Sequence, residues 1–63
     1  MRKFAVVLYV RNEGSTEKFN PWAFTISSDS RANAPVRAID LARKMHMETY
    51  CVYAVLDLPD SVG

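Results

Sequence analysis

The stretch Lys3–Asn12, KFAVVLYVRN, decides how the rest of this chain has to fold. A strand over 3–11 carries apolar side chains on both of its faces. One face holds Phe4, Val6, Leu8 and Val10, and the other holds Ala5, Val7 and Tyr9. A strand with one face in water alternates apolar and polar residues instead. We therefore predict that this strand is central in its sheet and that something covers each of its faces.

The length and composition leave few ways to stabilise such a fold. A chain of 63 residues forms one domain, here 1–63, and a domain of about 60 residues buries only about 60% of its unfolded surface. Cys51 is the only cysteine and His46 the only histidine, so we expect neither an internal disulfide nor a structural metal. With 49% hydrophobic residues the chain is expected to rely on close packing or on a partner.

The charge pattern and the N-terminal segment narrow the function classes. A net charge of +1 is too small to favour nucleic acid or an anionic membrane as the main partner. The apolar run after Lys3 is too short to span a bilayer. It leads directly into Arg11–Glu13 without a small-residue cleavage site, so we interpret it as a strand of a cytoplasmic protein rather than as a signal peptide.

Three further elements follow the first strand. WAFTISS, 22–28, alternates apolar and polar residues and predicts a strand, and Pro21 at its start suits an edge. A helix is predicted over 34–47, with Pro35 in its first turn. Its core face would hold Ala34, Ala38, Leu41, Ala42 and Met45, flanked by Ile39. TYCVYAVLDL, 49–58, is rich in β-branched and aromatic residues and predicts the last strand.

These elements predict an α+β fold with the order β-β-α-β. The first two strands form a hairpin, and a right-handed helical crossover brings the third strand to the other side of the first. The result is a three-stranded antiparallel sheet of order 3-1-2, with one helix packed on one face.

One helix covers only one face of that sheet, so the second apolar face needs an explanation. If the helix packs on the side of Phe4, strict alternation places Ala5, Val7, Tyr9, Cys51, Tyr53 and Val55 on the open side. An apolar patch of this kind often marks an interaction surface. A second chain is expected to cover it, with Val7, Tyr9, Tyr53 and Val55 at the centre. In the alternative, loop 12–21 folds back and covers it with Phe19 and Trp22.

Other candidate sites are weaker. Met45, His46, Met47 and Cys51 are ligand types that Cu(I) prefers, but consecutive helical residues point in different directions. His46 and Cys51 lack a third catalytic group, so we expect no enzyme and interpret Cys51 as a small buried apolar residue. SSDSRANAP, 27–35, is interpreted as ordinary helix capping rather than as an anion site. No cofactor is expected.

A second function class is a single-strand nucleic-acid-binding module. Tyr9 and Tyr53 would stack bases on the open sheet, as aromatic residues do in some RNA-binding sheets. Backbone phosphates would then be contacted by Arg2, Lys3, Arg11 and Lys18.

The layout resembles small ββαβ bacteriophage accessory proteins, among them the inhibitors of host RNA polymerase made by T7-like phages. The similarity is carried by FAVVLYV, WAFTISS, APVRAIDLARKM and TYCVYAVLDL in this order. PVRAIDLARK is also similar to the helix in the N-terminal module of HicB-type antitoxins. The resemblance implies a non-enzymatic protein that binds and modulates another macromolecule, in the host cytoplasm if phage-encoded. The expected function is therefore binding of a host or partner protein, through the open sheet face or by strand addition at an exposed edge, with a homodimer as the expected state.

Overall fold

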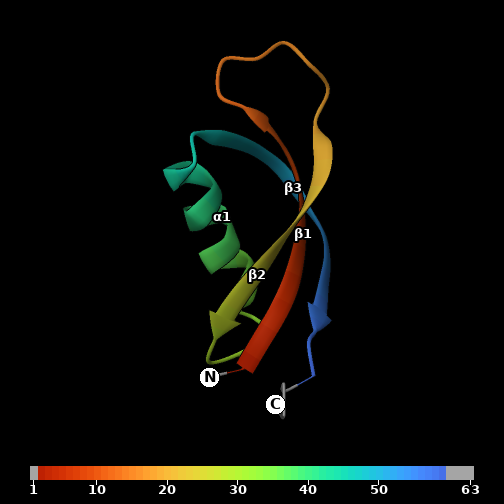
Figure 1. Ribbon diagram of the computed structural model, residues 1–63, viewed down its shortest axis with the longest axis vertical. Coiled ribbons are helices and arrows are strands. Elements are labelled where there is room, and N and C mark those ends of the chain that lie inside the picture. Colours follow the sequence, from red (N-terminus) through yellow and green to blue (C-terminus); the bar gives the residue numbers. More distant parts are fainter. Residues whose placement is uncertain (1, 60–63) are drawn as a thin grey trace.

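The computed structural model describes residues 2–59 and has the element order that the sequence predicts. The elements are β1 (Arg2–Asn12), β2 (Asn20–Ser28), α1 (Ala34–Lys44) and β3 (Met47–Asp57). The three strands form one antiparallel sheet with β1 between β2 and β3, and α1 lies on one side of it (Figure 1). The predicted fold class, sheet order and single helix are confirmed. The ends of the predicted domain, residue 1 and residues 60–63, lie outside the described residues.

The hydrophobic core lies between α1 and one face of the sheet. Its strand residues are Phe4, Val6, Leu8, Val10, Phe24 and Ile26, and its helix residues are Ala34, Ala38 and Ala42. The three alanines are fully buried, and their small side chains let the helix backbone approach the sheet closely. The predicted burial of Phe4 and the alternating residues that follow it is confirmed.

The helix ends three residues earlier than predicted, at Lys44 instead of residue 47. The chain reverses at His46, whose φ of 58° lies in the left-handed region and cannot continue a helix. Met45 therefore occupies the C-cap, where its N–H donates to the carbonyl oxygens of Leu41 and Ala42 at 3.1 Å each. The prediction that Met45 lies in the core is wrong, because its side chain is 45% exposed in this turn.

The β3 strand is irregular where it passes β1. Val7 lies opposite Ala54, but Leu8 lies opposite Val52, so Tyr53 is an extra residue in the ladder. A second register shift follows between Leu8 and Val10. Such bulges bend a strand and change which face its side chains occupy. Strict alternation along β3, on which the sequence prediction rested, therefore fails in the middle of the strand.

The β2 strand is regular by comparison. Its pairing with β1 runs without a shift from Arg2 opposite Ser28 to Val10 opposite Asn20. It starts two residues earlier than predicted and includes Pro21, opposite Tyr9. Proline lacks an N–H, and this position is tolerated because β2 is an edge strand.

Within residues 2–59, no helix is long and apolar enough to cross a membrane.

Candidate protein-binding face

The side of the sheet away from α1 is apolar and is called the open face here. Its residues are identified by their pairing with the alternate positions of β1. They are Ala5, Val7 and Tyr9 of β1, Ala23 and Thr25 of β2, and Tyr53, Ala54 and Leu56 of β3. None of these side chains carries a charge, and each is either half-buried or exposed. The open face therefore offers a continuous uncharged surface across all three strands.

Tyr9 and Tyr53 form the centre of the open face. Their ring centroids lie 5.5 Å apart with the ring planes at 89°, an edge-to-face arrangement that aromatic pairs prefer. Tyr9 is half-buried, whereas Tyr53 is 66% exposed. The structure thus brings together the two aromatic residues that the sequence singled out. It holds the ring of Tyr53 in one orientation and leaves most of it accessible.

The prediction that Val55 lies on this face is wrong. Val55 is opposite Val6 and packs against the core on the helix side. The bulge at Tyr53 explains the error, because it allows Tyr53 and Val55 to occupy opposite faces although they are two residues apart. Leu56, which the sequence pattern did not place on this face, lies opposite Ala5 and is 55% exposed. No glycine or proline in β3 signals the bulge, so the sequence contains no local marker for this change.

The loop between β1 and β2 covers only one end of the open face. Phe19 stacks on Tyr50 with ring centroids 5.4 Å apart, and the guanidinium of Arg11 lies 4.3 Å from the Phe19 ring centroid. Trp22 pairs with Leu8 and therefore lies on the helix side of the sheet. The alternative in which Phe19 and Trp22 cover the face is wrong for Trp22, and the aromatic partner of Phe19 is Tyr50. The centre of the open face is uncovered by the described part of the chain.

Charged groups occur only at the two ends of the open face. Lys3 precedes Ala5 on this side at one end. At the other end Arg11 Nε donates to Glu48 Oε2 at 2.6 Å. This hydrogen bond from Arg11 lowers the pKa of Glu48 below its usual value of 4.5. The pair keeps Glu48 ionised and neutralises most of the charge at that end.

The basic residues of the nucleic-acid hypothesis are dispersed. Arg2 donates to Asp57 Oδ1 at 2.6 Å and lies 5.1 Å from the centroid of the core residue Phe4, away from the open face. Arg11 is paired with Glu48, and Lys18 lies in the exposed hairpin loop. Lys3 is on the same side of the sheet as Tyr9 and takes part in no ion pair of the described residues, but it lies six residues from Tyr9 along β1. This distribution favours an apolar partner over a phosphate backbone.

The residues considered for metal or nucleophile chemistry belong to different environments. Met47 packs against the core, whereas Met45 and His46 lie exposed in the turn after α1. Cys51 is exposed, so the prediction of a buried cysteine is wrong; it lies in the irregular part of the edge strand β3. Among residues 2–59, no group of three or more His, Cys, Asp or Glu side chains is placed to hold a metal ion.

The polar residues 28–33 before α1 form hydrogen bonds with one another. The buried Ser28 hydroxyl donates to the carbonyl oxygen of Ser30 at 2.8 Å. Asn33 occupies the N-cap without a side-chain cap bond, and its side-chain amide donates to Asp29 Oδ1 at 3.1 Å. That bond, above all, lowers the pKa of Asp29. The Ser30 hydroxyl oxygen accepts from the Asn33 N–H at 3.3 Å, so neighbouring side chains order the turn into the helix.

A comparison of the chain with protein-family models, with curated proteins and with solved structures finds no match to any of them.

Proposed function

We propose that this chain is a small non-enzymatic binding protein, and that a second copy of the chain packs on its open face to form a homodimer. The observation that carries the proposal is the exposed Tyr53 ring, held beside Tyr9 at the centre of an uncharged three-stranded surface. Aromatic residues are enriched in protein interfaces, and charged residues are depleted at their centres. The layout resemblance stated above adds a setting, a phage or mobile-element accessory factor in the host cytoplasm.

The charges at the ends of the open face do not oppose a second copy as the occupant. Lys3 lies at one end, and Glu48 lies opposite Arg11 at the other. When two sheets pack face to face with their β1 strands antiparallel, the two-fold axis brings the Lys3 end of one copy over the Glu48 end of the other. The uncharged centres then meet without like-charge repulsion. No two like charges oppose each other in this arrangement, because Lys3 meets the Arg11–Glu48 ion pair, which is neutral overall.

The size of the open face predicts a weak, concentration-dependent dimer. Three strands about 4.8 Å apart and about 30 Å long present on the order of 400 Å² per copy, or about 800 Å² in a dimer. Interfaces below about 1,200 Å² in total are typical of transient complexes. We therefore expect half-association at micromolar rather than nanomolar concentrations.

The experiment is sedimentation equilibrium of the wild type and of Tyr53→Asp over a range of about 1 to 500 μM. The wild type should approach twice the mass of the chain, and Tyr53→Asp should remain monomeric because it buries a carboxylate in the apolar centre. Val36→Asp is the matched control, because Val36 is 64% exposed on the helix and away from the open face.

Salt distinguishes the two function classes. An apolar dimer interface should keep its mass between 50 mM and 500 mM salt, whereas nucleic-acid binding weakens steeply over such a range. A wild type that stays monomeric at 500 μM contradicts the homodimer. Salt-sensitive binding of a labelled single-stranded oligonucleotide, lost on Tyr53→Asp, would instead support the nucleic-acid module.

A further inference from the structure

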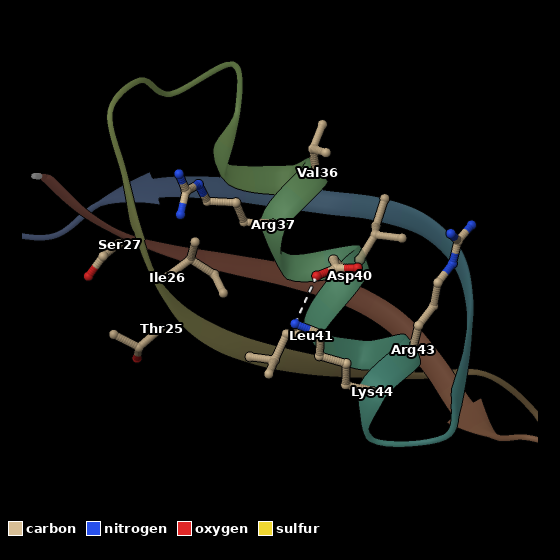
Figure 2. Close-up of a pocket in the computed structure, with 10 residues that line it drawn as sticks. Thr25, Ile26, Ser27, Val36, Arg37, Asp40, Leu41, Arg43 and Lys44 are labelled. Atoms are coloured by element: carbon tan, nitrogen blue, oxygen red, sulfur yellow. Dashed lines mark ion pairs between the residues drawn. The ribbon is translucent and has the colours of Figure 1, made fainter.

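A groove lies between α1 and the edge strand β2, on the helix side of the sheet. Figure 2 shows Ile26 of β2 pointing toward the helix, and Arg37, Leu41 and Lys44 on the side of α1 that faces β2. Thr25 and Ser27 of β2 border the space at the strand edge, with their side chains pointing away from the helix (Figure 2). The space has a volume of about 770 Å³. That volume falls in the range of ligand-binding clefts, about 300 to 1,000 Å³. The groove is separate from the open face.

The floor of the groove is apolar, and its helix wall is basic. Ile26 is buried, while Leu41 is 37% exposed although the sequence assigned it to the core. Arg37 and Lys44 are the basic residues on the side of α1 that faces β2, whereas the Arg43 side chain points away from β2 (Figure 2). Asp40 is the acidic residue among those that line the space. Asp40 is engaged by Lys44 at 3.3 Å, and none of the ion pairs among residues 2–59 uses Arg37 or Arg43. The Asp29 carboxylate, which precedes the helix, attracts Arg37 electrostatically but forms no ion pair with it, so the wall keeps a small excess of positive charge.

The outer edge of β2 is regular enough to pair with another strand, whereas the outer edge of β3 is not. The β3 edge is interrupted by two register shifts, and the Val55 carbonyl oxygen already accepts a hydrogen bond from Arg31 Nη2. Bulges and covered backbone groups are the means by which proteins protect an edge from pairing. β2 has a regular register, and from Ala23 to Ser28 it contains no proline, glycine or charged residue. The regular, unprotected edge is thus the one beside the groove.

We infer that this edge and groove bind an extended acidic segment of another protein, added to the sheet as a fourth strand beside β2. Main-chain hydrogen bonds to β2 would supply affinity, and alternate side chains would enter the groove. There, apolar groups meet Ile26 and Leu41, and carboxylates meet Arg37 and Lys44. Six extended residues span about 20 Å, which matches the length of β2 from Ala23 to Ser28.

The charges argue against a second copy of this chain in the groove. β2 contains no acidic residue, so pairing of two β2 strands would place no carboxylate opposite Arg37. It would also bring the Arg37 side chains of the two copies toward each other. An extended segment of another protein with acidic side chains can hydrogen-bond to the free backbone groups of β2 and place carboxylates near the basic helix wall. Because the groove and the open face lie on opposite sides of the sheet, the inference does not depend on the proposed dimer.

The probe is a fluorescein-labelled, end-capped hexapeptide of sequence Glu-Thr-Val-Thr-Glu-Thr, in which the two glutamates and the valine share one face of the extended chain. Its binding to the full chain is measured by fluorescence anisotropy. Saturable binding is expected, and the same peptide with lysine in place of glutamate should not bind. Arg37→Glu should weaken binding about tenfold, because it exchanges an exposed attraction for a repulsion. Lys18→Glu changes the net charge equally in the hairpin loop, away from the groove, and should weaken it far less.

Backbone methylation of the peptide tests strand addition itself. Hydrogen-bond donors on one edge of an extended peptide belong to every second residue. Methylating one alternate set of amide nitrogens should abolish binding, and methylating the other set should leave it nearly unchanged. Amide hydrogen exchange in residues 23–28 should slow on binding.

Three results would overturn the inference. They are the absence of saturable binding, equal affinity for the glutamate and lysine peptides, and indifference to both methylation patterns. Loss of binding in Tyr53→Asp would also overturn it, because that result would place the peptide on the open face. Monomeric wild-type protein with intact peptide binding would contradict the dimer alone.

Discussion

Val6 and Val7 are adjacent residues of one strand, and truncating each to alanine tests the two faces of the sheet separately. Val6 is fully buried under α1, whereas Val7 is half-buried on the open face. The substitution removes the same two carbon atoms at both positions. Any difference in the free energy of unfolding therefore reports on the environment of the side chain and not on its chemistry.

The expected magnitudes follow from burial. At Val6 the lost transfer free energy is about 1.6 kcal/mol, at about 0.8 kcal/mol per buried carbon, and the residual cavity adds about 1 kcal/mol. At Val7 water fills the vacated space in the monomer, so we expect about 1 kcal/mol or less. A domain of this size has a total stability of roughly 3 to 9 kcal/mol, so Val6→Ala removes a large fraction of it.

The assay is urea unfolding followed by the fluorescence of Trp22, at 5 μM and at 500 μM protein. With a slope near 1 kcal/mol per molar urea, the midpoint should fall by about 2.5 M for Val6→Ala and by about 1 M for Val7→Ala at low concentration. The wild-type midpoint should rise at high concentration, since association stabilises the folded state by mass action. Val7→Ala should lose most of that rise, whereas Val6→Ala should keep it.

Equal destabilisation by the two substitutions at 5 μM would refute the reasoning, because it would mean that the open face is fully covered in the monomer. A wild-type midpoint that does not change with concentration would contradict self-association.

Two further predictions concern the ends of the sheet and the helix contact. Arg11→Met should raise the pKa of Glu48 toward 4.5, as measured by NMR titration of the carboxyl group. Because the folded-state pKa is lowered, the stabilisation by this pair is present above pH 4.5 and is lost as the pH falls through the lower folded value. An unchanged Glu48 pKa would contradict the ion pair. Ala38→Leu should destabilise the fold by about 1 to 3 kcal/mol in thermal unfolding, because the fully buried methyl group leaves no room between α1 and the sheet; a stabilised variant would show that the contact is loose.

The edge strands show where sequence reasoning reached its limit. Pro21 marked β2 as an edge, and the uninterrupted apolar run of β1 marked it as central, since each pattern depends on local backbone chemistry. The bulges in β3 have no such local marker. They depend on how β3 meets β1, so the sequence misplaced Val55 and overlooked Leu56. The pairing of Tyr9 and Tyr53 was predicted from a regular register, yet the structure achieves it through an irregular one.

In the helix, too, one feature was predictable from local sequence and another was not. The spacing of Ala34, Ala38 and Ala42 identified the face that packs on the sheet, because a period of 3.6 residues aligns them. That spacing also assigned Leu41 and Met45 to the core. The structure exposes both, since the helix ends at Lys44 and its β2-facing side borders an open groove.

The amino-acid sequence by itself determined the element order, the central position of β1 and the buried face of the sheet, because these depend on hydrophobic periodicity and turn chemistry within short segments. Only the tertiary structure decided which residues of β3 share the open face with Tyr9, which edge remains regular and where the groove beside α1 opens. Those features depend on long-range register and on the crossing of separate elements, which no local pattern encodes.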